Sequence, residues 1–177
     1  MLAYLFVILA ILARMPFMPH PWNFAPLTAA LLYFGARGPR RQLWVAFALM
    51  AASDVILTKF VYAYPLGWDQ LVVWAWYAAI LWLGTRLREN SNWLRIGGAA
   101  LACSVSFFVI SNFAVWAAGT MYPKTMSGLM TCFAAGVPFF RRGVAGDMLF
   151  TAVMFGLPAL VAAATRSSHK PHGTAAA

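Results

Sequence analysis

The residues of this chain that could do chemistry are few, and they fall in otherwise apolar segments. Asp54 and Asn112 each lie late in an apolar segment, and Asp147 opens another. Ionisable groups cost several kcal/mol inside a bilayer and usually mark functional sites there. Each also has a structural explanation. Asp54 could pair with Lys59 or a neighbouring helix, Asn112 could join two helices, and Asp147 could cap a helix start.

Further candidates lie in the connecting segments close to these three residues. We expect the side chains that bind a ligand to be Trp22, Asn23, Asp54, Asn112, Trp116, Tyr122, Lys124, Cys132 and Asp147. His20 stands between two prolines and is interpreted as a loop residue. The two cysteines have no zinc-binding spacing, so we expect no metal site, and no acid and base are paired by spacing. No cofactor is indicated.

Composition places these residues in a membrane protein. Of 177 residues, 63% are hydrophobic and 10% are charged, against about 25% charged in soluble domains. Such a chain cannot cover a soluble surface and is too apolar to be disordered. It has 13 Lys and Arg against 4 Asp and Glu. In a membrane protein this excess indicates cytoplasmic loops, and no basic stripe interleaved with aromatic residues suggests nucleic-acid binding.

Apolar segments predict an all-α, polytopic fold with six transmembrane helices. We expect these helices at residues 1–13, 24–36, 42–58, 71–85, 96–118 and 148–165. Residues 126–140 are apolar but shorter than the roughly 20 residues of a straight span, so they predict a short re-entrant or interfacial helix. A seventh span is the alternative. One transmembrane domain would cover residues 1–165, followed by a disordered polar tail at 166–177.

Arginine distribution predicts the orientation of these helices. One side of the predicted bundle carries Arg37, Arg40, Arg41, Arg86, Arg88 and Arg95, and the other carries Arg14, Lys59 and Lys124. The positive-inside rule places the first group, and with it the N-terminus, in the cytoplasm. We therefore expect an inner-membrane protein. The candidate ligand residues converge on the outer side, which suggests a mostly apolar pocket open to the outside.

Several short motifs in the chain together resemble those of a known family. They are His20-Pro21-Trp22-Asn23-Phe24-Ala25-Pro26, Ser53-Asp54, Ser111-Asn112-Phe113-Ala114-Val115-Trp116, Tyr122-Pro123-Lys124-Thr125 with Gly128-Leu129, Pro138-Phe139-Phe140 and Gly146-Asp147. Across about residues 20–157 the chain resembles small bacterial membrane proteins of unknown function that are described as transport proteins. By analogy, it is similar in size and span number to the S components of energy-coupling factor vitamin transporters.

This resemblance implies capture of a small, vitamin-like or cofactor-like solute from the outer side. It also implies a transmembrane coupling protein and an ATPase as partners, besides the lipid bilayer. The spacing of Ala25 and Ala29 gives a smooth helix face that could dock such a partner or pack within the chain. Two alternatives stay open: a membrane-embedded enzyme that uses the thiol of Cys132, and a structural or assembly subunit. An enzyme ranks second, because no catalytic pair is evident.

Overall fold

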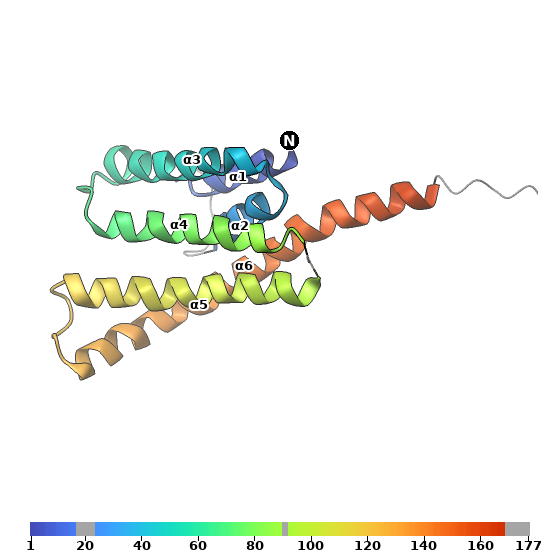
Figure 1. The fold of residues 1–177 in the computed structure, drawn as a ribbon. Coiled ribbons are helices and arrows are strands. Elements are labelled where there is room, and N and C mark those ends of the chain that lie inside the picture. The colour runs from blue at the N-terminus through green and yellow to red at the C-terminus, as the bar shows by residue number, and fades with distance from the viewer. Residues whose placement is uncertain (17–23, 90–91, 169–177) are drawn as a thin grey trace, which may run out of the picture.

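The expected all-α fold is confirmed by a computed structural model, which describes residues 1–16, 24–89 and 92–168 (Figure 1). Six α-helices form in these residues. They are α1 (Leu2–Ala13), α2 (Leu27–Arg37), α3 (Leu43–Ile56), α4 (Asp69–Arg86), α5 (Trp93–Ala118) and α6 (Met126–Ser168). A 3₁₀ turn, η1 (Arg40–Gln42), precedes α3, and a π-helical turn, η2 (Leu57–Val61), extends it.

The first two helices are half-length and central. With 12 and 11 residues, α1 and α2 are only about 18 and 17 Å long, against about 30 Å of bilayer hydrocarbon. Gly38-Pro39 follows α2 and ends it, because proline restricts the residue before it. Every residue of α2 from Thr28 to Ala36 is buried. The short helix α2 is therefore the centre of the core, with α1, α4 and α6 packed around it.

Two glycines set the closest helix approach. A Cβ built on Gly84 of α4 would lie 2.5 Å from the Leu32 carbonyl oxygen and 2.8 Å from the Gly35 Cα. The reciprocal Cβ on Gly35 would lie 2.4 Å from the Leu81 carbonyl oxygen. Since real Cβ atoms do not approach so closely, α2 and α4 can cross at this distance only with glycine on both sides. Arg88 then fastens the end of α2 by donating to the Gly35 and Gly38 carbonyls at 2.8 and 2.6 Å.

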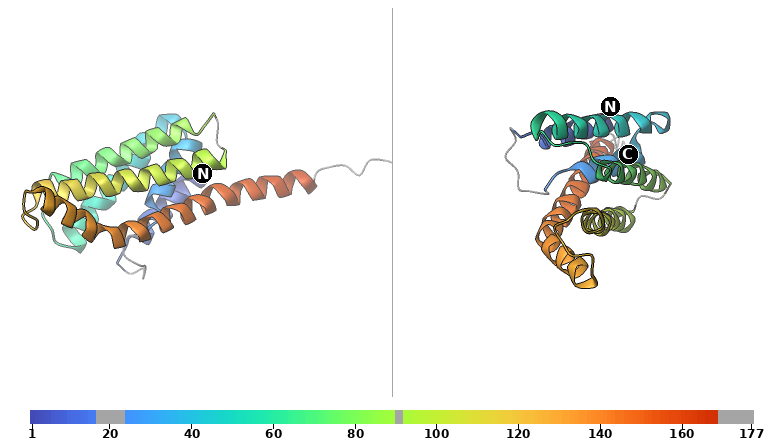
Figure 2. Two further views of the ribbon diagram at one scale, coloured as in Figure 1. Left: turned by 90° about the horizontal axis from the view of Figure 1, so that it is seen from below. Right: turned by 90° about the vertical axis from the view of Figure 1, so that its left-hand side faces the viewer.

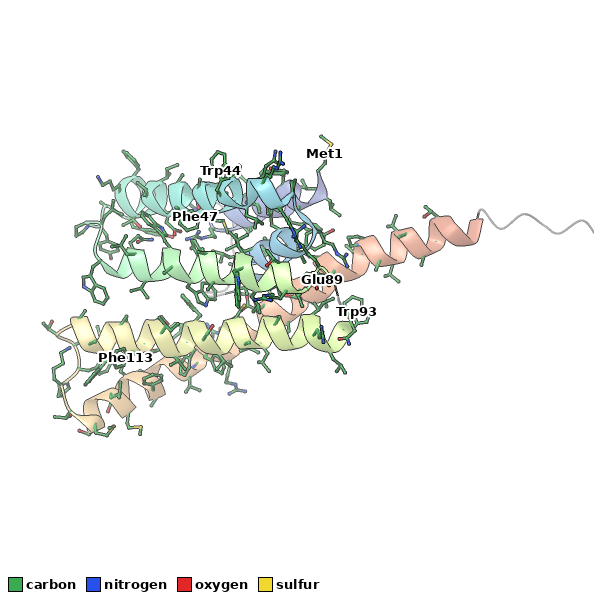
Figure 3. All side chains as sticks on the ribbon, in the orientation of Figure 1. Met1, Trp44, Phe47, Glu89, Trp93 and Phe113 are labelled. Atoms are coloured by element: carbon green, nitrogen blue, oxygen red, sulfur yellow. The ribbon has the colours of Figure 1, made fainter. Side chains whose placement is uncertain are left out.

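The longer helices run along the length of the bundle. Figure 1 shows α3, α4 and α5 stacked in that order, with α6 crossing obliquely behind α5, from below it on the left to above it on the right. The N-terminal Met1 lies at the same end as Glu89 and Trp93, which flank the turn between α4 and α5 (Figure 3). The arginine-rich turn between α2 and α3 also lies at this end (Figure 1). The loops after η2 and after α5 lie at the opposite end.

The prediction of a separate short helix at residues 126–140 is wrong. The helix α6 continues without a break for 43 residues, through Pro138 and Pro158, and it extends past the bundle (Figure 2). The sequence interpretation ended one helix at residue 140, because the apolar stretch is short, and began the next at residue 148. Charged side chains do not interrupt backbone hydrogen bonds, however, and a proline removes only one such bond and bends the helix.

Three stretches of the described chain are long and apolar enough to cross a membrane. They are residues Arg40–Val61, Trp93–Ala118 and Met126–Thr165. Large apolar side chains point outward from each of them, including Trp44, Phe113 and Leu160, which are 68%, 52% and 68% exposed. Contact of so many apolar side chains with water is unfavourable. We therefore interpret the chain as a membrane protein in which these helices face lipid.

Candidate ligand cavity

A cavity of about 820 Å³ lies where the ends of α1 and α2 meet the longer helices. It is within the range of 300–1,000 Å³ that is usual for small-molecule sites. Its lining mixes polar groups and aromatic rings from α2 to α6 and from the residues that follow α1. The lining includes Arg14, Thr28, Asp54, Trp76, Tyr77, Ser104, Phe107, Phe108, Asn112, Phe139, Phe140 and Asp147.

Asp54 is the centre of one polar cluster in this lining. Its carboxylate, 2% exposed, accepts a hydrogen bond from the Arg14 guanidinium at 2.5 Å. Tyr77 donates to the same carboxylate oxygen at 3.2 Å, and the Trp74 indole donates to the other at 3.1 Å. The buried charge is therefore matched by one cation and two neutral donors. Its partner is Arg14 at the end of α1, and the exposed Lys59 does not pair with it.

Sequence reasoning missed the partners of Asp54. It placed Arg14 on the outer side of the predicted bundle and assigned it no partner. In the structure Arg14 and Trp74 both lie against a carboxylate that is far away in the sequence. The available signal was Arg14 itself, a charge directly after an apolar helix, because a charge at that depth needs a partner.

Asp147 is the centre of a second cluster, on the α5–α6 side. It is 8% exposed and accepts a hydrogen bond from the Ser104 hydroxyl at 2.6 Å, and its side chain is also hydrogen-bonded to Thr28. The suggestion that Asp147 caps a helix start is wrong, since it lies inside α6. Within the described residues Asp147 forms no ion pair. Its negative charge is thus met by hydroxyl groups only.

The two long helices present regular stripes to the cavity. On α5 the lining positions are 104, 107, 108, 111 and 112, and on α6 they are 136, 139, 140, 143, 144 and 147. Both sets follow the spacing of one helix face. The helices run antiparallel, so Ser104 meets Asp147 at one end of this wall, and Asn112 meets Gly136 at the other. Phe108 and Phe140 pack between these ends with their ring centroids 4.6 Å apart.

Asn112 lines the cavity, and its side-chain oxygen is available to accept a hydrogen bond from a ligand. Its amide nitrogen donates to the Phe108 carbonyl at 2.7 Å. Its carbonyl oxygen lies directly over Gly136, where a built Cβ would approach it to 2.5 Å. Glycine at position 136 therefore makes room for an acceptor oxygen in the cavity wall.

Other candidate residues lie elsewhere. Cys132 is 2% exposed and does not line the cavity. Its thiol donates a hydrogen bond to the backbone carbonyl of Asn112 at 3.4 Å. Tyr122 is half-buried and also lies outside the lining. Trp22 and Asn23, with His20, fall outside the described residues.

Trp116 and Lys124 close the turn between α5 and α6. The Trp116 indole donates to the Pro123 carbonyl at 2.9 Å, and the Lys124 ammonium donates to the Trp116 and Gly119 carbonyls. A cation at these free carbonyls stabilises the carboxyl end of α5. These contacts give both residues a structural role at the end of α5. Neither lines the cavity.

The small-residue face at Ala25 and Ala29 packs within the chain. Ala29 is fully buried in α2, and Ala25 contributes to the cavity lining. Ala29 is therefore closed to a partner protein, which favours the alternative that these residues pack within the chain. The described residues also contain no group of three His, Cys, Asp or Glu side chains that could hold a metal ion.

Comparison with known proteins gives one match. No curated protein and no solved structure matches the chain. The sequence model of a family of unknown function, DUF6580, matches residues 1–170, which is nearly the whole chain. Because this match covers nearly the whole chain, the protein belongs to this family of unknown function, DUF6580.

Proposed function

We propose that this protein binds a small, partly apolar solute in the cavity and is the membrane-embedded binding subunit of an uptake system. The observation that carries this proposal is the convergence of Asp54, Asn112 and Asp147, from three helices, on one cavity of about 820 Å³. Aromatic rings between polar ends are the usual chemistry of a small-molecule site. A vitamin-like or cofactor-like solute, as the resemblance implies, would fit such a lining.

We further propose an orientation in the inner membrane. The N-terminus and the arginine-rich turns share one end of the bundle (Figure 1), and the positive-inside rule assigns that end to the cytoplasm. In this arrangement α3, α4, α5 and α6 cross the bilayer, and α1 and α2 form a half-length hairpin from the cytoplasmic side. A coupling protein and an ATPase would then contact a surface other than α2.

An impermeant thiol reagent applied to intact cells tests this orientation. Single cysteines at Arg40 and Arg88 should be shielded, and one at Lys124 should be labelled, in a chain whose two native cysteines are replaced by alanine. Labelling at 40 and 88 with protection at 124 would invert the arrangement.

A binding screen tests the function. Protein purified in detergent is heated with each of a panel of vitamins and related cofactors, and the shift of the melting temperature is measured. A true ligand should raise it in a concentration-dependent way. Asn112→Leu should weaken that response, because it removes a cavity oxygen. Gly98→Ala, at a site with open space around it, should leave it unchanged. A panel without any stabilising compound would argue against the proposal.

An enzyme that uses the Cys132 thiol gains no support from the geometry. The thiol is buried, is hydrogen-bonded to a backbone carbonyl, and does not line the cavity. A solute in the cavity would not contact it.

A further inference from the structure

The two buried carboxylates of the cavity are satisfied in different ways. Asp54 has the Arg14 guanidinium at 2.5 Å, so their charges compensate each other. Asp147 is 8% exposed and has hydroxyl partners, Ser104 and Thr28, with no ion pair in the described part of the chain. A buried, ionised carboxylate is most stable beside an opposite charge. Asp147 is therefore a buried carboxyl group of the cavity that has no counter-charge in the described part of the chain.

The wall between Asp147 and Asn112 is lined by aromatic rings. Going along α6 from Asp147 toward its start, Phe140 and Phe139 line the cavity two helical turns away, at about 11 Å. From α5, Phe107 and Phe108 line the same wall. The faces of aromatic rings attract cations, and sites that bind quaternary ammonium groups combine such rings with a carboxylate.

We propose that the ligand is an organic cation, with its positive group at Asp147, its apolar body between the rings of α5 and α6, and a donor group at the Asn112 oxygen. This inference rests on the proposed solute-binding function and names its substrate class. Ser104 and Asn112 are eight positions apart on α5, which corresponds to about 12 Å along the helix. This is the distance between the two polar ends of the cavity wall.

An anionic ligand fits this cavity poorly. The one arginine in the lining is Arg14, whose guanidinium is already hydrogen-bonded to Asp54 and to the Ser53 hydroxyl at 3.4 Å. An anion near Asp147 would meet a like charge without a free cation from the lining. A neutral ligand would leave the Asp147 carboxylate without a counter-charge.

Isosteric probes that differ in charge test the proposal. Choline is compared with its neutral analogue 3,3-dimethyl-1-butanol and the anion 3,3-dimethylbutyrate, with benzyltrimethylammonium as an aromatic cation. Binding to the full chain in dodecyl maltoside is measured by titration calorimetry. We expect both cations to bind, and choline to bind at least about tenfold more tightly than its neutral analogue. Equal or tighter binding of the neutral or anionic probe would overturn the proposal, as would failure of both cations to bind.

Variants with matched controls locate the site. Asp147→Asn should weaken cation binding about tenfold or more, and Glu89→Gln, which removes an exposed carboxylate, should not change it. If Asp147→Asn fails to fold, Phe140→Leu provides an independent test. It keeps an apolar side chain but removes the ring, and we expect about threefold weaker binding of benzyltrimethylammonium. Phe113→Leu, outside the cavity, is its control. Cation binding unchanged in both Asp147→Asn and Phe140→Leu would refute the site.

The outcomes separate this inference from the proposed function. If an anionic or neutral compound from the vitamin panel binds in an Asn112-dependent manner and the cations do not, solute binding stands and the cation inference falls. If no compound of any charge binds, the proposed function itself falls.

Discussion

The ion pair between Arg14 and Asp54 should contribute strongly to stability, because it fastens the end of α1 to α3. Asp54 is 2% exposed and the Arg14 side chain 21%. Removing one partner of a buried pair costs about 3–5 kcal/mol, since the other charge stays buried without compensation. For Asp54→Asn we expect the lower part of this range, about 3 kcal/mol, because Arg14 borders the cavity. The asparagine oxygen can still accept the hydrogen bond from Trp74 or Tyr77.

A double-mutant cycle isolates the pair from its surroundings. Arg14→Met should cost about as much as Asp54→Asn, since it leaves the carboxylate buried with only two neutral donors. The double variant removes both charges and should be more stable than the sum of the two single losses predicts, by about 1–3 kcal/mol. The free energy of unfolding is measured in mixed dodecyl maltoside and sodium dodecyl sulfate micelles, by circular dichroism. Glu89→Gln, at an exposed carboxylate, is the control.

Two results would refute the reasoning. Strictly additive losses would mean that the two charges do not interact in the folded protein. An Asp54→Asn variant as stable as the wild type, with weaker ligand binding, would mean that Asp54 serves the ligand and Arg14 does not satisfy it.

Three more predictions follow from helix packing. Gly84→Ala should destabilise the protein by about 1–3 kcal/mol or more, because the alanine Cβ would overlap the backbone of α2. Gly98→Ala, which has open space around it, should stabilise α5 slightly. The melting temperatures of the two variants in detergent test both expectations. Positions Ser127 and Ala162 are about 52 Å apart along α6, so spin labels at cysteines introduced there should lie somewhat closer than this, because the prolines bend the helix. A far shorter distance by double electron–electron resonance would indicate a break. Lys124→Met should speed amide hydrogen exchange at the end of α5 without changing exchange in α2, and unchanged exchange at α5 would show that the lysine does not hold that end.

The sequence was sufficient to predict the all-α fold, the membrane character and three of the side chains that line the cavity. Asp54, Asn112 and Asp147 could be selected because polar side chains are conspicuous in apolar helices. The lining stripes of α5 and α6 were also accessible in principle, since Ser104, Phe108 and Asn112 repeat at four-residue intervals. What they face depends on how the helices pack.

Three features of the fold could not be predicted in this way. The partnership of Arg14 with Asp54 joins residues 40 apart in the sequence, and no local pattern encodes it. The continuity of α6 was missed because helices were placed by the length of apolar stretches, and the end of such a stretch does not by itself end a helix. Trp116 and Lys124 lie outside the cavity lining, and the partners of their side chains are backbone carbonyls in and just after α5. Basic side chains near the carboxyl end of a helix often bind its free carbonyls in this way.

The half-length helices give a physical reason for the cavity to be where it is. The end of α1 contributes Arg14 and Pro16 to the lining, and the start of α2 contributes Leu27 and Thr28. Among the described residues no side chain caps the start of α2, so its first backbone amides lack that partner. Within the hydrocarbon region, interrupted helices are tolerated only where the break is buried in protein or faces a polar cavity. The start of α2 faces such a cavity, and the clusters around Asp54 and Asp147 line it.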